Sequence, residues 1–222
     1  MELMYKPRVK ICCIRSIAEA QLAIKYGASA IGLVSAMPSG PGPISEELIA
    51  EIAATVPSGV ETFLLTSKQS AHEVIAQQRR TQVTTIQLVD RFPLSEYNIV
   101  RRELSRIRII QVIHVRDDSA VKEASAVVPY VDGLLLDSGN PTLAVKELGG
   151  TGRVHNWSIS KQICEAIDIP LFLAGGLKPK NVREAIEIVR PYGVDVCSGV
   201  RTNGGLDEKK LANFFTAVRN SN

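Results

Sequence analysis

The sequence lacks the features that mark several classes of protein. No apolar run reaches the roughly 18–20 residues that a membrane helix needs. The first six residues, Met-Glu-Leu-Met-Tyr-Lys, carry an early acid and no apolar stretch of the kind found in a secretory signal. Aromatic residues make up only 5% of the chain, but 45% hydrophobic and 22% charged residues are ordinary for a globular protein and exclude a disordered one. We expect one domain over residues 1–222 and no contact with a membrane.

An excess of charge of one sign is also missing. Lysine and arginine outnumber aspartate and glutamate by only 26 to 23, a net charge of +3. A nucleic-acid-binding protein normally gathers its basic residues on one face or arm. The densest basic group here consists of Arg101, Arg102, Arg106 and Arg108, which we interpret as the solvated face of a helix. The sequence therefore predicts no nucleic-acid partner.

Cysteine occurs four times, and no two cysteines form a C-x-x-C pair. The spacings fit neither a zinc site nor a disulfide framework, which predicts no metal and a reduced, cytoplasmic setting. Cysteines in apolar segments are usually small core residues, but a thiolate at a strand end can act as a base or nucleophile. From the residues alone, Cys12 could be a core residue or a base or nucleophile. Alternation along a strand places Lys10 on the same face as Cys12 and Cys13 on the opposite face.

Short apolar runs alternate with longer amphipathic ones along the whole chain. Runs that are nearly continuous in valine, isoleucine and leucine are typical of parallel strands buried on both faces. Eight such runs occupy residues 9–14, 30–34, 62–65, 85–88, 109–115, 133–136, 171–174 and 194–197. The clearest helical patterns between them span residues 17–24, 46–54, 72–78, 95–104, 182–189 and 208–218, with Ser45, Asn181 and Asp207 as expected N-caps. Eight units of about 28 residues predict a single α/β domain with the (β/α)8 TIM-barrel fold.

Glycine gathers in three stretches late in the chain, at residues 149–152, 175–176 and 198–199, and the last two follow the seventh and eighth apolar runs. In such barrels the chemistry lies at the C-terminal ends of the strands, and the loops after strands seven and eight often bind phosphate. Glycine lets backbone N–H groups approach an anion closely, although the same residues also make tight turns. We predict that backbone groups hold a phosphate, with little help from a basic patch. The candidate phosphate-binding residues are Gly150, Thr151, Gly152, Gly175, Gly176, Ser198 and Gly199.

Asp137 follows the sixth apolar run directly. A carboxyl group at the mouth of a dry barrel is open to a raised pKa through desolvation, which suits a general acid. The equally simple alternative is a helix cap or a hydrogen bond within a loop. From the residues alone, both roles remain possible for this aspartate.

Several motifs resemble those of the phosphoribosylanthranilate isomerase family, the (β/α)8 enzymes of the tryptophan pathway. The matching stretches are Lys-Ile-Cys at residues 10–12, Leu-Leu-Asp-Ser at 135–138, Gly-Gly-Thr-Gly at 149–152, Leu-Ala-Gly-Gly-Leu-Lys-Pro-Lys-Asn-Val at 173–182, and Arg-Pro-Tyr-Gly-Val-Asp-Val-Cys-Ser-Gly-Val at 190–200. The resemblance extends over the whole chain, but it is weak between residues 35 and 108.

The resemblance implies an Amadori rearrangement of an aminoaldose phosphate to an aminoketose phosphate, with no metal and no cofactor. It implies that Asp137 is the general acid and Cys12 the general base, and that the glycine loops hold the phosphate of the substrate. Lys10, Gln87 and Arg153 are further candidate substrate contacts. The expected partner is a phosphorylated small molecule, and the expected assembly is a monomer or a homodimer.

The sequence also departs from the family. The loop at residues 39–43 lacks the arginine that pairs with the anthranilate carboxylate, and Val89-Asp90 replaces His-Gly, which places a negative charge near that carboxylate. His155-Asn156-Trp157 replaces Phe-Asp-Trp, and Cys13 replaces glycine. These changes leave an alternative open, a diverged barrel that binds a phosphorylated ligand without catalysing this reaction. Metal-dependent phosphosugar epimerases fit less well, because the three histidines are scattered along the chain.

Overall fold

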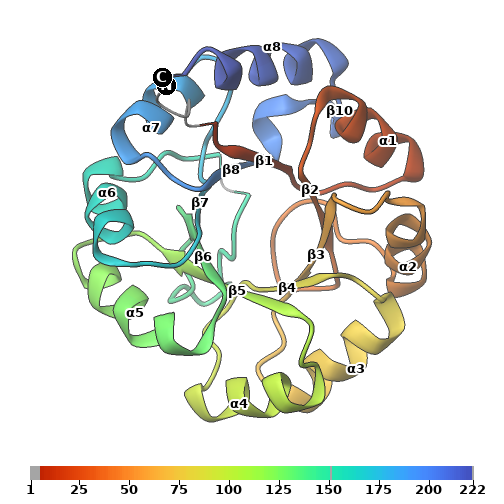
Figure 1. The fold of residues 1–222 in the computed structure, drawn as a ribbon, viewed down its shortest axis with the longest axis vertical. Helices are drawn as coiled ribbons and strands as arrows, with labels where there is room; N and C mark the ends of the chain where they lie inside the picture. Colours follow the sequence, from red (N-terminus) through yellow and green to blue (C-terminus); the bar gives the residue numbers. More distant parts are fainter. Residues whose placement is uncertain (1–5, 151, 222) are drawn as a thin grey trace.

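A computed structural model describes residues 6–150 and 152–221 of the chain. Eight parallel strands form a closed barrel, with helices around its outside (Figure 1). Each strand pairs with the next one along the chain, and β8 pairs in parallel with β1 to close the ring. The predicted (β/α)8 barrel is therefore confirmed.

The strands lie close to where the apolar runs predict them. They are β1 Arg8–Ile11, β2 Ala30–Val34, β3 Glu61–Thr66, β4 Thr85–Leu88, β5 Arg108–His114, β6 Gly133–Asp137, β7 Leu171–Leu173 and β8 Gly193–Val196. A short hairpin follows β8, formed by β9 Arg201–Thr202 and β10 Gly205–Leu206. The first strand differs most from the expectation of residues 9–14, because it ends at Ile11 and leaves both following cysteines outside the ladder.

The helices run antiparallel to the strands on the outside of the barrel. They are α1 Ile17–Tyr26, α2 Glu46–Thr55, α3 Ala71–Thr81, α4 Leu94–Glu103, α5 Ser119–Val127, α6 Trp157–Ala166, α7 Val182–Val189 and α8 Glu208–Arg219, with short 3-10 turns η1 Val128–Tyr130 and η2 Ser198–Val200. Two of the expected caps are present: Ser45 accepts a hydrogen bond from the Leu48 N–H at 3.3 Å, and Asp207 accepts one from the Lys210 N–H at 3.0 Å.

The third expected cap is wrong. Asn181 precedes α7, but its side chain makes no capping bond with that helix. Its Oδ1 instead accepts a hydrogen bond from the Lys178 N–H at 2.8 Å, and its Nδ2 donates to the Gly176 carbonyl at 3.1 Å. The amide therefore braces the loop after β7, because both of its bonds reach backward along the chain.

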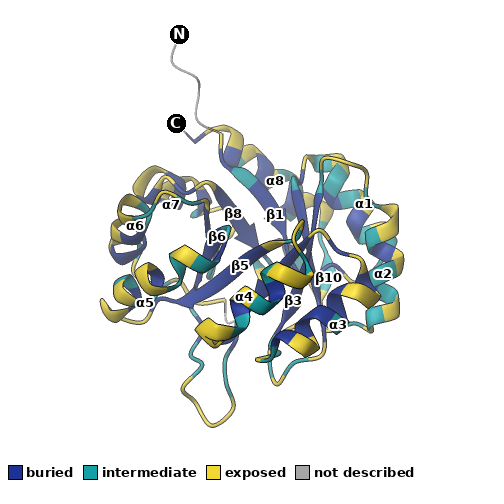
Figure 2. Cartoon of the chain, turned by 60° about the horizontal axis from the view of Figure 1, so that its bottom comes forward, coloured by how far each residue is buried: buried dark blue, intermediate teal, exposed yellow. Residues whose placement is uncertain are grey.

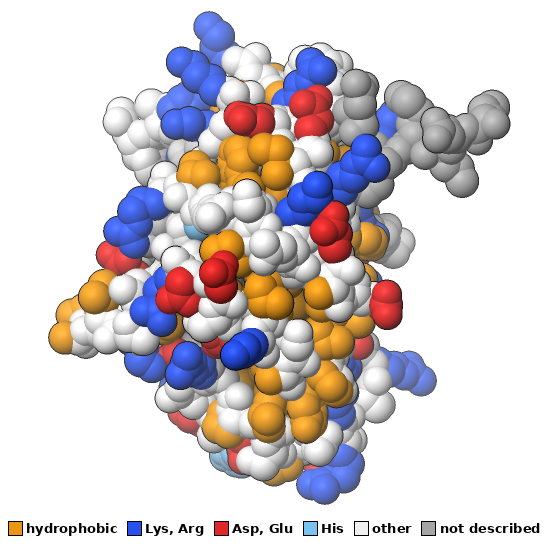
Figure 3. Space-filling model, turned by 90° about the vertical axis from the view of Figure 1, so that its left-hand side faces the viewer, with side chains coloured by type: hydrophobic (Ala, Val, Ile, Leu, Met, Phe, Trp, Pro, Cys, Tyr) orange, Lys and Arg blue, Asp and Glu red, His pale blue; other side chains and the backbone are white. Residues whose placement is uncertain are grey.

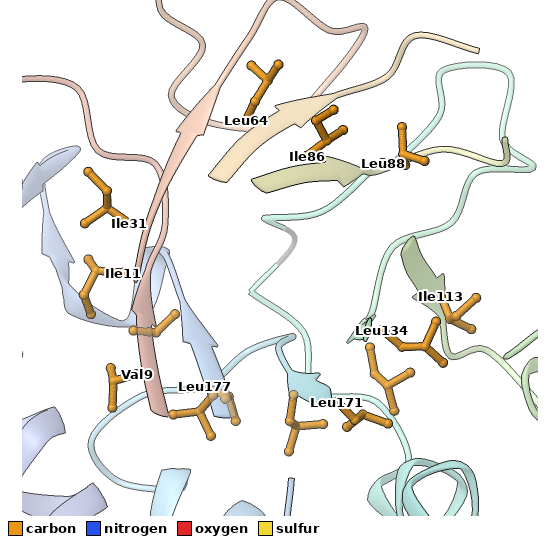
Figure 4. Close-up of a cluster of buried hydrophobic side chains, with 14 of the residues drawn as sticks. Val9, Ile11, Ile31, Leu64, Ile86, Leu88, Ile113, Leu134, Leu171 and Leu177 are labelled. Atoms are coloured by element: carbon orange, nitrogen blue, oxygen red, sulfur yellow. The ribbon is translucent and has the colours of Figure 1, made fainter. Parts of the chain in front are cut away.

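Two separate cores hold the barrel together. The larger core lies between the sheet and the helices, and Figure 4 shows it as side chains contributed by successive strands, among them Ile11, Ile31 and Leu134. The smaller core fills the barrel itself, where Phe63 and Phe172 meet edge to face with ring centroids 5.8 Å apart. In Figure 2 the barrel strands are buried along almost their whole length, whereas the helices expose their outer faces. Burial on both faces explains why the strand runs do not alternate with polar residues.

The basic group near residue 101 does not form one helical face. Arg101 and Arg102 lie on α4, Arg106 lies in the turn after it, and Arg108 begins β5. Arg101 pairs with Asp132 at 2.7 Å and Arg108 with Glu61 at 3.1 Å, so acids neutralise much of the charge. Figure 3 shows another side of the molecule on which lysine and arginine are interspersed with acids. Among the described residues, no helix has the length and apolarity required to cross a bilayer.

Two long loops meet over the C-terminal end of the barrel. They are the β2–α2 loop, residues 35–45, and the β6–α6 loop, residues 138–156, part of which crosses the inside of the strand ring in Figure 1. The Ser39 hydroxyl donates to the Lys146 carbonyl and accepts from the Leu148 N–H at 3.4 Å. A Cβ at Gly150 would lie 2.3 Å from Cδ of Pro41, so glycine is required for this approach.

We predict that the interior core contributes strongly to stability. Replacing the fully buried Phe63 with alanine leaves a cavity inside the barrel, and we expect the free energy of unfolding to fall by roughly 3–5 kcal/mol. Denaturant unfolding followed by circular dichroism measures this loss. As a control, Val145→Ala shortens a side chain that is 67% exposed, and its effect should stay within about 0.5 kcal/mol. Equal losses for the two variants would contradict a packed barrel interior.

Candidate active site

A buried lysine forms the floor of the barrel mouth. Lys10 is fully buried, with its Nζ 3.0 Å from Oδ1 of Asp195 and 5.1 Å from the ring centroid of Phe63. Burial alone would lower the pKa of the Lys10 ammonium, but the charge of Asp195, with a further contribution from Cys12, raises it above its ordinary value. Lys10 therefore remains a cation inside the barrel.

The Cys12 thiol lies beside this cation. A Cβ at Gly32 of β2 would be 2.8 Å from the Cys12 Sγ and 3.2 Å from the Lys10 Nζ, so both atoms reach the space that a side chain at residue 32 would fill. A neighbouring ammonium stabilises a thiolate. The sequence interpretation missed Gly32. A glycine inside an apolar strand often marks a place where another group approaches the backbone closely, and here the side chains of Cys12 and Lys10 do so.

Asp137 faces the same mouth from the other side of the ring of strands. It is the last residue of β6 and only 9% exposed, and its Oδ1 accepts a hydrogen bond from the Ser138 N–H at 2.7 Å. A Cβ at Gly149 would lie 2.7 Å from its Oδ2, and a Cβ at Gly175 would lie 3.2 Å from its Oδ1. Part of the glycine cluster therefore surrounds the candidate acid.

His155 is a neutral neighbour of this acid. Its Nε2 lies 2.7 Å from the Ser160 hydroxyl, and its buried Nδ1 has no hydrogen-bond partner among the described residues. A Cβ at Gly175 would lie 2.8 Å from this Nδ1, which places the ring on the Asp137 side of the mouth. Burial lowers the pKa of His155 to about 4, although the charge of Asp137 acts in the opposite direction. The ring is therefore uncharged at neutral pH.

The expected orientation of Cys13 is wrong. Its φ of 60° is left-handed, which breaks the strand alternation, and its side chain joins Cys12 in the interior cluster. A Cβ at Gly42 would lie 2.9 Å from the Cys13 Cβ, so a side chain at residue 42 would collide with this cysteine. The β2–α2 loop, which lacks the arginine, therefore packs directly against Cys13 at Gly42.

A cavity of about 510 Å³ joins the three glycine-bearing loops. It is lined by Gly152, Gly176, Ser198 and Gly199, which supports their predicted role, and Gly150 and Gly175 line a smaller hollow that links it to Asp137. Thr151 lies outside the described residues. The cavity is also lined by three lysines, which the sequence interpretation missed: Lys178, Lys180 and Lys210. An anion there would meet positive charge as well as backbone N–H groups.

The negative charge of Asp90 is neutralised within the structure. The Lys146 ammonium pairs with its Oδ2, and the Arg91 N–H donates to its Oδ1 at 2.8 Å. The expectation that Asp90 would repel a carboxylated substrate took no account of this cation, because Lys146 comes from the distant β6–α6 loop. The replacement at residues 89–90 therefore adds an ion pair to the mouth.

The other candidate substrate contacts lie in different surroundings. Gln87 projects from β4 with its Oε1 buried and without a hydrogen-bond partner among the described residues. Arg153 is exposed and pairs with Glu147. Both positions are compatible with contact to a bound molecule, so the substrate contacts of Gln87 and Arg153 stay predictions.

A second cavity, of about 290 Å³, opens beside Cys13 and Gly42 and is lined by two arginines. Arg201 is held between the carboxylate of Glu19, 2.9 Å away, and the carbonyl of Cys13, 2.6 Å away. Arg15 donates to the Gly204 carbonyl and has no acidic partner for its guanidinium among the described residues. Within the part of the chain that the structure describes, Arg15 is therefore the arginine of this cavity whose charge no acidic side chain neutralises.

Comparison with known proteins decides the family. The sequence profile described as N-(5'phosphoribosyl)anthranilate (PRA) isomerase matches residues 9–217. The chain belongs to the phosphoribosylanthranilate isomerase family. The isomerase of Methanosarcina acetivorans is 35% identical, with 96% of this chain and 94% of that protein covered. Isomerase 1 of Methanosarcina mazei is 33% identical, with 100% and 99% covered.

Solved isomerase structures share the barrel. The Thermotoga maritima isomerase is 28% identical, with a TM-score of 0.83 over 96% of this chain and 98% of that one. An isomerase solved in complex with reduced 1-(o-carboxyphenylamino)-1-deoxyribulose 5-phosphate is 26% identical, with a TM-score of 0.80 and the same coverage. The ligand of that second structure carries a carboxyphenyl group at one end and a phosphate at the other.

We predict a pH-dependent contribution of His155 to stability. The unfolded chain binds a proton at this histidine near pH 6.5, whereas the folded chain does so only near pH 4, so stability falls as the pH drops from 6.5 to 4. The pKa difference corresponds to a loss of up to about 3 kcal/mol. His155→Phe removes this loss. The free energy of unfolding of the variant, measured with denaturant, should therefore rise relative to that of the parent protein as the pH falls.

The exposed His72 provides the control for this measurement. His72→Gln replaces an exposed histidine and so measures how much of any change comes from the loss of a histidine as such. A difference between His155→Phe and the parent protein that stays constant between pH 7 and pH 4 would contradict a buried neutral imidazole.

Proposed function

We propose that the protein catalyses the isomerisation of phosphoribosylanthranilate by general acid and general base catalysis, as the names of its relatives indicate. One observation carries the proposal: a thiol beside a buried ammonium and a buried carboxyl group face the same barrel mouth from different strands. The cavity lined by the late glycines and lysines adjoins this mouth and supplies the phosphate site.

Asp137 starts the reaction as the general acid. It donates its proton to the ring oxygen of the ribose, the bond from C1 to that oxygen breaks, and the nitrogen lone pair forms a C1–nitrogen double bond. The carboxyl group is well placed for this step because it is buried and borders the hollow that leads to the phosphate cavity. Holding the phosphate fixes the ribose relative to the acid, and such positioning lowers a barrier by up to roughly 7–11 kcal/mol in well-oriented cases.

Cys12 completes the rearrangement as the general base. Its thiolate removes the proton from C2, the electron pair of that bond forms a C1–C2 double bond, and the C1–nitrogen π pair returns to nitrogen. The resulting enolamine becomes the ketone as the C2 hydroxyl loses its proton and C1 gains one. Lys10 stabilises the thiolate before this step and stays paired with Asp195 after it. C2 is oxidised and C1 is reduced within one molecule, so the balance of electrons requires no redox cofactor, and we propose a reaction without a metal.

The carboxylate of the anthranilate requires a cation in place of the missing arginine. Arg15 is the strongest candidate, because its guanidinium lines the second cavity and has no acidic partner among the described residues. That cavity adjoins the mouth, since Cys197 and Ser198 line both. The substrate would then span the mouth, with its phosphate near the late glycines and its aromatic ring near the β2–α2 loop.

We predict that both proposed catalytic groups are essential for turnover. Cys12→Ala and Asp137→Ala should each lower kcat by at least roughly 10²–10⁴-fold, because each removes one proton-transfer group. Affinity for a phosphorylated product analogue, measured by calorimetry, should change little, because the phosphate cavity is intact. Cys164→Ala, at a cysteine on α6, is the matched control.

Growth of a tryptophan auxotroph that lacks the isomerase provides the readout in cells. The parent protein and Cys164→Ala should restore growth, whereas the two active-site variants should not. Full activity of either active-site variant would overturn the assigned roles. Tight binding of the analogue by a parent protein that shows no turnover would replace the proposed reaction with ligand binding alone.

A second prediction identifies the cation that meets the substrate carboxylate. Arg15→Gln should raise KM by roughly 10- to 100-fold, the cost of one charge-assisted hydrogen bond, with a smaller change in kcat. Arg153→Gln is the direct comparison, because that arginine is already paired with Glu147. A rise in KM for Arg153→Gln alone would assign the carboxylate to Arg153 instead.

A further inference from the structure

Three thiols gather where β1 and β8 end. Ile11 of β1 pairs with Val196 of β8, and the Cys12 N–H donates to the Val196 carbonyl at 2.9 Å, so Cys12 and Cys197 follow directly on neighbouring strands. Neighbouring strands lie about 4.7–4.9 Å apart, so the chain segments that carry Cys12 and Cys197 run side by side, and Cys13 is the residue directly after Cys12. The left-handed backbone of Cys13 returns its side chain to the same interior cluster.

The Cys13 thiol shares this interior cluster with Cys12 and with Cys197, which packs against it. Hydrogen bonding with Cys12, and then with Cys197, raises the pKa of the Cys13 thiol. The hydrogen bond from Cys13 lowers the pKa of the Cys197 thiol despite its burial, and the charge of Arg201 acts in the same direction. The two pKa shifts have opposite directions, so Cys197 is the thiol of the pair that ionises first, as an attacking cysteine does, and Cys13 is the candidate resolving cysteine.

Both of these thiols are reachable by a small molecule. Cys13 and Cys197 line the cavity of about 290 Å³ beside Gly42, and Cys197 also borders the hollow that leads to Asp137. Cys164 offers a contrast within the same chain, because its thiol donates to the Arg190 carbonyl at 3.6 Å and burial raises its pKa. A small oxidant therefore meets its most reactive partner at the barrel mouth.

We propose that Cys13 and Cys197 form a hydroperoxide-sensitive pair that oxidises to a disulfide at the barrel mouth. The Cys197 thiolate attacks one oxygen of hydrogen peroxide, the O–O bond breaks, and one water leaves, which gives a sulfenic acid. The Cys13 sulfur then attacks the Cys197 sulfur, and a second water leaves. Two thiols and one peroxide thus become one disulfide and two waters, with sulfur oxidised and the peroxide oxygens reduced.

The position of this disulfide would affect the proposed catalytic base. It would remove the Cys13 S–H from beside the Cys12 thiol and tie the segment that carries Cys12 to the end of β8. It would also narrow the cavity that both cysteines line. We therefore expect oxidation to suppress turnover, and a dithiol reductant to restore it, since thiol–disulfide exchange reverses the bond.

The test is a titration of the reduced protein with hydrogen peroxide, followed by alkylation, proteolysis and mass spectrometry. Fragment spectra must distinguish Cys13 from Cys12, because both lie on one tryptic peptide. The expected result is a Cys13–Cys197 link that appears in step with the loss of isomerase activity, both reversed by dithiothreitol. The mapped link is independent of the reaction, so it stands even where the proposed isomerase function fails.

Three variants sharpen the test, each compared with its own untreated rate. Cys13→Gly suits the left-handed backbone at that position, and Cys197→Ser keeps a small polar side chain; both should lose the dithiothreitol-reversible part of the inactivation. Cys164→Ser should respond as the parent protein does. Circular dichroism confirms that each variant is folded before treatment.

Several results would overturn the proposal. One is reversible inactivation that persists in Cys197→Ser, which would place the oxidation on Cys12 itself. Another is a disulfide between other cysteines, or none at a peroxide dose that abolishes activity. A Cys13–Cys197 disulfide that forms while turnover stays unchanged would equally refute the switch.

Discussion

The ion pair between Lys10 and Asp195 inside the barrel is the interaction on which the active end depends. Removing two charges from water is expensive, and only close pairing offsets it, so losing one partner of a buried pair typically costs about 3–5 kcal/mol. The two residues are direct partners in the register of β1 and β8. A slip by one residue would turn one of them to the helix side of the sheet. The pair therefore fixes the register at which the barrel closes and also places an ammonium beside Cys12.

The sequence predicted the barrel because its signals are local. Strands buried on both faces must be apolar throughout, and such runs are visible without knowing what they touch. The same rule brought Cys12, Asp137 and the late glycines to one end, since parallel strands share the direction of their C-terminal ends. The left-handed backbone of Cys13 was not predictable in this way, because alternation assumes that the strand continues, and β1 ends at Ile11.

Contacts with distant loops explain why the sequence interpretation misjudged two of the departures from the family. Taken singly, Asp90 and the loop without arginine both argue against the family reaction. In three dimensions Lys146 pairs with Asp90, and the guanidinium of Arg15 lines the cavity beside Gly42. Neither arrangement has a local signature, because each joins segments that lie far apart in the sequence. The effect of a departure from a motif is therefore better judged together with the residues that contact it in the folded structure.

The two proposed catalytic groups have different neighbours at the mouth. Cys12 lies beside the buried Lys10 ammonium, which is itself paired with Asp195. Asp137 borders the same hollow as Asp195, and it lies among glycines and beside His155, an imidazole that burial keeps neutral at physiological pH. The histidine that replaces an aromatic ring at residue 155 therefore brings no cation to the side of the proposed acid.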